Sequence, residues 1–450
     1  MNTTNRRYWL QSGFLSLMIN FQNLLFGFGS FYFLVRMLDK HSFGVWSLFI
    51  ATTTIFDSAR SGMIQNALIK YLSGSPDEEH PRILSASFFL SGALMLACIA
   101  INISLAGYLA HIWHDDRLVK MFYAFNLVYL LQGILYQLQW VEQANLSFKG
   151  VLLTSVIRQG GFFFYIVLAW IRHWPFTLMN FIWVQAICAL AATLVQYFFV
   201  RKNLVLAKKV DRAWVKTLFG YGKYVFGTNI SGILTGTINQ MMLGALLSAD
   251  AAGAFNVAVR ITTLTEVPTN ALGTIVFPQS AKRFATDGQT AIKYLYEKSV
   301  GTILANLIPS LGFLFLFPDF VVHTVAGSKY PETIPIIRIT VLYCLLTPFS
   351  RLFGTILDSI GKPRINFVII VLFTTVELVL TWYMIIAFGI IGAVYATLAA
   401  SLLFFIVMQV ILAKQLKINF LNTFVHAVQF YPEFYRKYLR KIAYFSSHKP

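Results

Sequence analysis

The sequence has few acidic residues and almost no cysteine. Asp and Glu together number 18 against 36 Lys and Arg, and only 12% of the 450 residues are charged. The three cysteines, Cys98, Cys188 and Cys344, are far apart, and each lies in an apolar run. This spacing excludes a disulfide framework or a cysteine metal cluster and favours packed thiols.

Motifs of enzyme chemistry are also scarce. The sequence has no Gly-rich phosphate loop, nucleophile elbow or zinc-protease helix. The HxxHDD run at 111–116 resembles a metal site only loosely, and a solvated loop end explains it better. We therefore predict a protein that is not an enzyme and that needs no metal or cofactor.

Long apolar runs are abundant instead. Hydrophobic residues make up 57% of the chain, and the mean hydropathy is +0.65. A helix needs about 20 apolar residues to cross the hydrocarbon core of a bilayer. Twelve runs of this length predict an all-α integral membrane protein. They lie near 12–36, 44–68, 84–110, 119–141, 150–172, 177–200, 222–247, 251–280, 297–317, 333–358, 365–387 and 389–413.

The basic residues predict the orientation of these spans. If the N-terminus is cytoplasmic, 25 of the 36 Lys and Arg residues fall in inner segments, 6 fall at outer ends and 5 lie within spans. Lys and Arg concentrate on the cytoplasmic side of membrane proteins. Both termini are therefore predicted to be cytoplasmic.

The chain carries an internal repeat at an offset of 209 residues. Residues 37–57 and 246–266 share a short polar link, a Gly-x-aromatic start, a Thr-Thr pair and an acid at the end, Asp57 or Glu266. Asn20 matches Asn229 at the same offset. Many transporters consist of two such halves. The predicted domains are two six-helix bundles at 1–205 and 222–414, a basic linker at 206–221 and a basic amphipathic tail at 415–450.

The linker and the tail mix basic with apolar or aromatic side chains. This pattern is typical of segments that lie on the inner leaflet. Basic residues beside aromatic ones also occur in nucleic-acid sites, but anionic lipid is the better partner directly after a last span. We predict binding to membrane lipids and none to nucleic acid.

Charged side chains inside the spans are the strongest functional signal. A charge near the bilayer centre costs at least about 2.5–3.5 kcal/mol, so such residues face a bundle interior or a wet cavity. Asp57 and Arg60 are three residues apart and can pair with each other on one helix. Other arginines have no acid within four residues in the sequence and need a cross-helix partner, a wet cavity or an anionic substrate. The candidate set is Arg60, Arg158, Arg260 and Arg351.

Amide side chains gather on the first helix of each predicted half. Two interpretations stay open for them. They bridge helices, as amides in membrane bundles often do, or they bind a hydroxyl-rich ligand such as a sugar. The candidates for sugar contacts are Asn20, Asn229, Asn239 and Gln240.

Several segments together resemble a known family. Their order and spacing carry the resemblance more than any one motif does. They are FLVRMLDKHSFGVWSL (33–48), YGKYVFGTNISGIL (221–234), GAFNVAVRITTLTEVPTNALGTIVFPQSAKRF (253–284), VAGSKYPETIPIIRI (325–339), LDSIGKPRINF (357–367) and FGIIGAVYATLAASL (388–402). The chain resembles the polysaccharide (Wzx-type) flippases of the multidrug/oligosaccharidyl-lipid/polysaccharide exporter superfamily over roughly 10–415.

The resemblance implies a MATE-like fold of two six-helix bundles around a central cavity. It also implies a substrate made of an undecaprenyl-type lipid, a diphosphate and a short oligosaccharide, held by cationic cavity residues. These would be Arg60 and Arg260, with Arg158 and Arg351 after them. We predict a flippase in the bacterial inner membrane for cell-surface polysaccharide such as O-antigen, with a glycan polymerase and a chain-length regulator as further partners.

Two alternatives belong to other classes. A drug or cation antiporter of the same superfamily needs an acidic cavity, whereas arginines outnumber acids here. A membrane-embedded glycan polymerase or ligase needs a substantial outer loop, and the longest one predicted, about 318–332, is short.

The matched acids are the candidates for ion coupling. Asp57 has Arg60 one turn away, so a structural ion pair is its main predicted role. Glu266 lies six residues from Arg260, about 120° around the helix. We therefore predict that Glu266, more than Asp57, couples transport to a proton or cation gradient.

Overall fold

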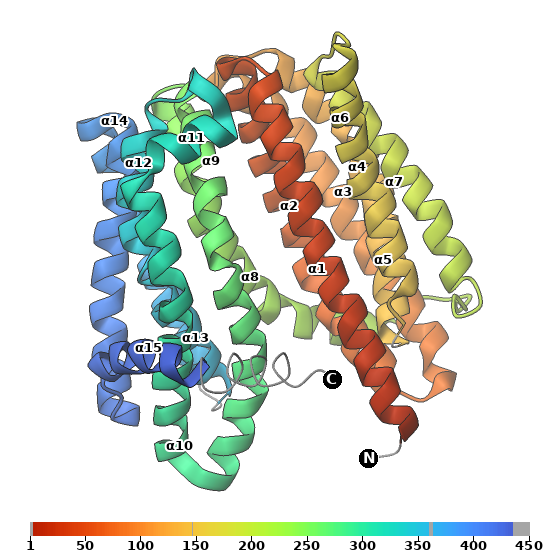
Figure 1. Ribbon diagram of the computed structural model, residues 1–450. Helices are drawn as coiled ribbons and strands as arrows, with labels where there is room; N and C mark the ends of the chain where they lie inside the picture. The colour runs from red at the N-terminus through yellow and green to blue at the C-terminus, as the bar shows by residue number, and fades with distance from the viewer. Residues whose placement is uncertain (1–2, 146, 360–362, 435–450) are drawn as a thin grey trace, which may run out of the picture. The chain divides into compact units, whose positions relative to one another are not determined.

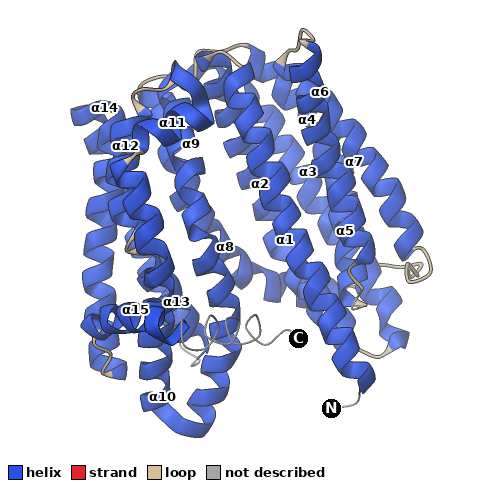
Figure 2. Ribbon diagram, viewed as in Figure 1, coloured by secondary structure: helices blue, strands red, loops and turns tan. Residues whose placement is uncertain are grey.

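The computed structural model describes residues 3–145, 147–359 and 363–434, except for many side chains in 3–17, 224–235 and 267–291 and those of 358, 359 and 363. The described chain is helical, with short turns and no strand (Figure 2). This confirms the predicted all-α class.

The first eight α-helices follow one another mostly through short connections, the longest being residues 201–211 between α7 and α8 (Figure 1). They are α1 (Thr3–Met37), α2 (Lys40–Gly74), α3 (His80–Ile112), α4 (Arg117–Ala144), α5 (Lys149–Ser155), α6 (Gly161–Arg172), α7 (Leu178–Val200) and α8 (Arg212–Leu246). Those of the second half are α9 (Ala249–Thr263), α10 (Val267–Leu316), α11 (Pro318–Ala326), α12 (Thr333–Cys344), α13 (Thr347–Ser359), α14 (Pro363–Leu416) and α15 (Phe420–Phe434).

Eight stretches of the described helices are long and apolar enough to cross a membrane. One of them, Arg364–Leu416, covers two predicted spans. The predicted boundary between those two is present as a kink, because Gly389 has φ 61° and ψ −141° inside α14. A backbone with φ > 0 is readily adopted only by glycine. The total of twelve spans stays a prediction.

Several helices begin where a polar side chain can cap them. The side chain of Asp39 accepts from the Ser42 amide at the start of α2, and Thr177 accepts from the Asn180 amide at the start of α7. Asp211 accepts from the Ala213 amide, so α8 begins inside the predicted linker. Such caps satisfy amides that have no partner within the helix.

Other breaks differ from the predicted ones. The span predicted at 150–172 contains a π-helical turn at Val156–Gly160 between α5 and α6. A 3-10 turn at Leu264–Glu266 separates α9 from α10, and α10 itself bends back in Figure 1 rather than ending near 280. Hydrophobic periodicity does not register these local changes, because the apolar run continues through them.

The chain divides into two compact units, residues 1–253 and 254–450. The first unit has a core of Ile64 and Leu68 on α2, Ile83 on α3, Val141 on α4 and Leu218 on α8. It therefore includes α8, although the sequence repeat places this helix in the second half.

Close backbone contact holds α8 against α2. A Cβ atom added to Gly222 would overlap the carbonyl oxygen of Met63, and one added to Gly244 would lie 2.7 Å from Leu48 side-chain atoms. Interior packing leaves no room for even one more methyl group at such sites. Glycine at these positions is therefore a packing requirement of the first unit.

The second unit is built on α10, α13 and α14. Tyr296, Phe353 and Met408 belong to its core. Figure 1 shows α15 running across α10, and Gly301 of α10 lies against the backbone of Thr423 at the crossing. The carboxylate of Glu297 accepts from the Asn419 amide at 2.9 Å and from Asn422 Nδ2 at 3.1 Å. Glu297 thereby anchors the start of α15.

The contact between α2 and α8 can be tested with a matched pair of glycines on α8. We expect Gly222→Ala to lower the free energy of unfolding by about 1–3 kcal/mol, the usual cost of overpacking. Nothing lies within 4 Å of a Cβ on Gly220, so Gly220→Ala should leave stability unchanged or slightly higher. Thermal unfolding of the detergent-purified variants measures both. Equal stability of the two variants would contradict the packing argument.

Candidate functional site

The predicted pair between Asp57 and Arg60 is present on α2. Arg60 Nη2 donates to Asp57 Oδ1 at 2.7 Å. The arginine is only 3% exposed, whereas Asp57 is partly exposed. The pair therefore compensates a guanidinium that has left solvent, but it engages only one of the terminal nitrogens of that group.

Tyr136 of α4 brings a second arginine to the same place. The guanidinium carbon of Arg60 lies 5.8 Å from the centroid of the Tyr136 ring, and that of Arg158 lies 5.6 Å from it. Both distances are in the range of cation–π attraction. Arg158 sits in the π-helical turn Val156–Gly160, a type of distortion that often occurs at functional sites. Three helical segments thus meet around one aromatic ring.

Each of these arginines keeps an unused donor. Arg60 Nη1 and Arg158 Nε are buried and have no hydrogen-bond partner among the described residues. Leaving a buried charged donor unpaired is costly, more so than for a neutral one. The arrangement suits an anion with several oxygens, since two guanidinium groups can each donate to it.

Two buried amides of α4 follow the bridging interpretation. Gln137 donates to Ser87 at 2.5 Å and Gln139 to Thr154 at 2.9 Å, so these amides on α4 bridge helices. Asn239 and Gln240 are buried on α8, and Asn20 is exposed on α1. The side chain of Asn229 lies outside the described residues.

The second unit holds the other predicted charges. Arg260 and Arg351 are exposed, and Glu266 is half-buried in the turn before α10. Arg351 acts electrostatically on Glu266. Arg260 forms no ion pair with any side chain that the structure describes. Glu266, which lies six residues from Arg260 in the sequence, thus interacts electrostatically with Arg351.

Sequence reasoning missed Glu142, a buried acid at the end of α4. Its carboxylate accepts from the Gly150 amide at 2.9 Å, from Ser147 Oγ at 2.9 Å and from Gln196 Nε2 at 2.6 Å. It caps α5 and ties α4 to α7. A buried acid at the end of a span, followed by a polar turn and a new helix, was the available signal.

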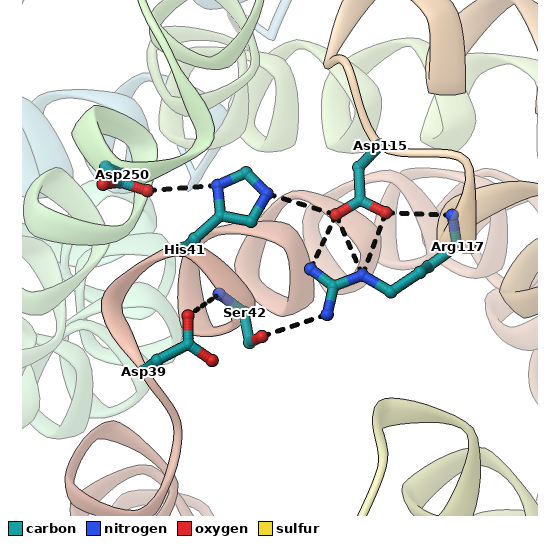
Figure 3. Close-up of polar contacts among 6 residues, drawn as sticks. All are labelled: Asp39, His41, Ser42, Asp115, Arg117 and Asp250. Atoms are coloured by element: carbon teal, nitrogen blue, oxygen red, sulfur yellow. Dashed lines mark hydrogen bonds and ion pairs between the residues drawn. The ribbon is translucent and has the colours of Figure 1, made fainter.

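A second polar cluster lies where α2, α4 and α9 begin (Figure 3). His41 faces Asp250 and Asp115, each at 3.2 Å, and Arg117 Nη2 donates to Asp115 at 2.7 Å. Burial would raise the pKa of the Asp115 carboxyl, but the hydrogen bonds from Arg117 outweigh it and lower that pKa. Asp115 therefore stays ionised at neutral pH.

A cavity of about 510 Å³ adjoins this cluster. Asp39, Ser42, Arg117, Lys120 and Thr177 supply its polar lining, and Met37, Met121 and Phe176 are among its apolar residues. None of the arginines predicted to bind substrate lines it.

The role of Glu142 predicts a large effect of its removal. In Glu142→Ala three donors lose their acceptor, and each buried donor left unpaired costs about 1–3 kcal/mol. The matched control is Glu433→Ala, which breaks an exposed pair with Lys298 and should cost at most about 1 kcal/mol. Thermal unfolding in detergent distinguishes the two, and a small effect at Glu142 would contradict the capping role.

Curated relatives of this chain include proteins of glycan biosynthesis. The probable low-salt glycan biosynthesis flippase Agl15 of Haloferax volcanii is 25% identical over 190 residues, which are 42% of this chain and 40% of that protein. The lipopolysaccharide biosynthesis protein WzxC of Escherichia coli is 21% identical over 337 residues, 74% of this chain and 66% of that protein. The chain thus spans about two-fifths to two-thirds of the length of these relatives.

Solved transporter structures share the fold. An inward-facing multidrug resistance transporter of the MATE family has a TM-score of 0.71 at 13% identity, with 87% of this chain and 95% of that chain covered. The lipid II flippase MurJ in an inward closed conformation has a TM-score of 0.70 at 14% identity, with 95% and 99% covered. The predicted MATE-like membrane fold is confirmed, and the chain is a multi-pass membrane protein.

The profile of one protein family matches residues 33–335, about two-thirds of the sequence. The matched region runs from the end of α1 to the start of α12 and includes Arg60, Tyr136, Arg158 and Glu266. The chain belongs to the polysaccharide biosynthesis protein family.

Proposed function

We propose that the protein is a flippase that moves a lipid-linked oligosaccharide across the membrane for polysaccharide biosynthesis. The observation that carries the proposal is the pair of arginines on Tyr136, each with a buried donor that has no partner in the described structure. A diphosphate offers several charged oxygens to such donors. Membership of a polysaccharide biosynthesis family supports the link to polysaccharide biosynthesis, and the carrier in this proposal is of the undecaprenyl-diphosphate type.

Each part of this substrate has a matching group in the chain. Arg60 and Arg158 of the first unit bind the diphosphate, and Arg260 and Arg351 are the basic candidates of the second unit. Asn20, Asn229, Asn239 and Gln240 contact sugar hydroxyls. The prenyl chain stays in the lipid, because apolar side chains cover much of the outer surface of the spans.

The two alternatives fit less well. A drug or cation antiporter binds cations. The charged residues around Tyr136, however, are two arginines, Arg60 and Arg158, and one acid, Asp57. A glycan polymerase or ligase is an enzyme, whereas the fold is that of transporters. The proposed setting is the bacterial inner membrane with both termini cytoplasmic and with a glycan polymerase and a chain-length regulator as partners.

Flipping itself is the primary test. Purified protein in vesicles should move an undecaprenyl-diphosphate oligosaccharide to the opposite leaflet, and protein-free vesicles should not. Cells without the gene should accumulate the lipid-linked repeat unit on the cytoplasmic face. Accumulation on the outer face would instead indicate a polymerase or ligase.

The arginines can be tested one at a time. We expect Arg60→Ala and Arg158→Ala to weaken binding of undecaprenyl diphosphate about ten- to a hundredfold, because one charge-assisted hydrogen bond contributes about 1.5–3 kcal/mol. The Arg→Lys variants should recover part of the loss, since the charge remains but the bidentate fork does not. Arg260→Ala should reduce surface glycan at normal protein levels.

Arg201→Ala is the matched control. Arg201 also lies over an aromatic ring, 5.7 Å from Phe198, but it is exposed at the end of α7. It should bind the lipid as the wild type does. Wild-type binding by properly inserted Arg60→Ala and Arg158→Ala would remove the diphosphate site from the proposal.

Glu266 is the proposed coupling residue, and Asp57 is secondary because Arg60 holds it. Because Arg351 acts electrostatically on Glu266, protonation of that carboxyl would change its interaction with Arg351. Glu266→Gln removes titration but keeps shape, so it should lose gradient-driven flipping and retain lipid binding. The measurement is the flipping rate in vesicles with and without a proton or sodium gradient. An unchanged gradient dependence would exclude Glu266 from coupling.

A further inference from the structure

Two helix starts meet at equivalent positions of the internal repeat. His41 in the first turn of α2 contacts Asp250 in the first turn of α9, and the two residues are 209 apart. Gly44 and Gly253 have the same separation, and a Cβ on Gly253 would lie 3.0 Å from Gly44 Cα. This close approach of backbones brings the His41 ring to the carboxylate. We refer to the contact formed by residues 41–44 and 249–253 as the helix-start contact.

The His41 ring bridges two carboxylates. Its Nδ1 lies 3.2 Å from Asp250 Oδ1 and its Nε2 lies 3.2 Å from Asp115 Oδ2 (Figure 3). A neutral imidazole has one N–H donor and one acceptor lone pair, whereas the imidazolium has two donors. Only the protonated ring can therefore donate to both carboxylates. The neutral ring would turn a lone pair toward one of them.

Asp115 is a fixed partner in this bridge. Arg117 donates to it through Nε at 3.0 Å, through Nη2 at 2.7 Å and through its backbone amide at 2.9 Å. Arg117 Nη1 also donates to Ser42 Oγ at 3.1 Å, which ties α4 to α2. The buried Asp115 thus stays in place, and the partly exposed Asp250 is the partner that can be released.

Two of the carboxylates near the ring are held in place by other donors. Asp39 already accepts from the Ser42 amide, and although burial would raise its pKa, the hydrogen bonds of Ser42 lower it, so it too stays ionised. Carboxylates within a few ångströms stabilise a cation. The titratable and charged groups at these helix starts are Asp39, Lys40, His114, Asp115, Asp116, Arg117, Lys120 and Asp250.

We propose that His41 is a positioning residue of the transport cycle whose imidazolium holds the starts of α2 and α9 together and whose deprotonation releases Asp250. The proposal concerns the flipping activity proposed above, but its first test needs no substrate. Histidine ordinarily changes charge between pH 5 and 8, so the contact is strengthened at the acid end of that range.

The first experiment compares thermal unfolding in detergent at about pH 5.5 and about pH 8.5. The wild type should show a melting temperature that falls as the pH rises through this range. His41→Gln should lose most of this dependence, because glutamine cannot become a cation. The control is His323→Gln, which changes an exposed histidine on α11 and should behave as the wild type. An unchanged pH dependence in His41→Gln would refute the proposed role of His41 in the helix-start contact.

The second experiment measures flipping in vesicles with the same pH on both sides. Release of the contact should change the wild-type rate between the two pH values by about two- to fivefold, the size expected for one half-exposed ion pair. In His41→Gln the two rates should be equal. If stability loses its pH dependence but the flipping profile does not change, His41 is structural only and the positioning role is wrong.

Asp250→Asn provides an independent variant in case His41→Gln does not fold. It removes the releasable anion and leaves the contacts of Asp115 with His41 and Arg117 intact, so it should reduce the pH dependence of both stability and flipping below that of the wild type. A wild-type profile in Asp250→Asn would overturn the proposal. If the wild type itself moves no lipid-linked oligosaccharide, the proposed function fails. The unfolding experiment still decides whether protonation of His41 stabilises the helix-start contact.

Discussion

A guanidinium group inside an apolar helix bundle has to be compensated by the protein itself, and this constraint shapes the first unit. Arg60 is compensated by Asp57 on its own helix and by the face of Tyr136, and the same ring serves Arg158. Neither contact uses all the donors of these arginines. The proposed diphosphate site depends on this incomplete compensation. A fully paired network would stabilise the bundle but offer nothing to a diphosphate.

The parts of this site that follow local spacing could be predicted, and the parts that depend on packing could not. Asp57 and Arg60 are three residues apart, so any helix brings them together. Tyr136 lies in another apolar span, where an aromatic residue is unremarkable, and only the packing of α4 reveals its contact with both arginines. Likewise, the neighbour of Glu266 is Arg351, 85 positions along the chain. Apolar periodicity predicted the helices well, because burial in lipid requires it, but it is insensitive to the turns at Val156–Gly160 and Leu264–Glu266.

Buried glutamates show the other limit of sequence reasoning. An acid near the end of a span suggests a transport role when only the sequence is known. Glu142 and Glu297 instead receive backbone amides at the starts of the helices that follow or cross them. The donors around these two carboxylates give them a structural role that their position in the sequence does not reveal.

The helix-start contact brings together residues at equivalent positions of the internal repeat. Residues that touch their own repeat equivalents lie close to a local approximate twofold axis, where an unmodified repeat would set each residue against an identical one. Glycine tolerates this, and Gly44 faces Gly253. A charged residue does not, because two like charges at hydrogen-bond distance repel. At the neighbouring pair of equivalent positions the two residues differ, and His41 faces Asp250 rather than a residue of its own kind.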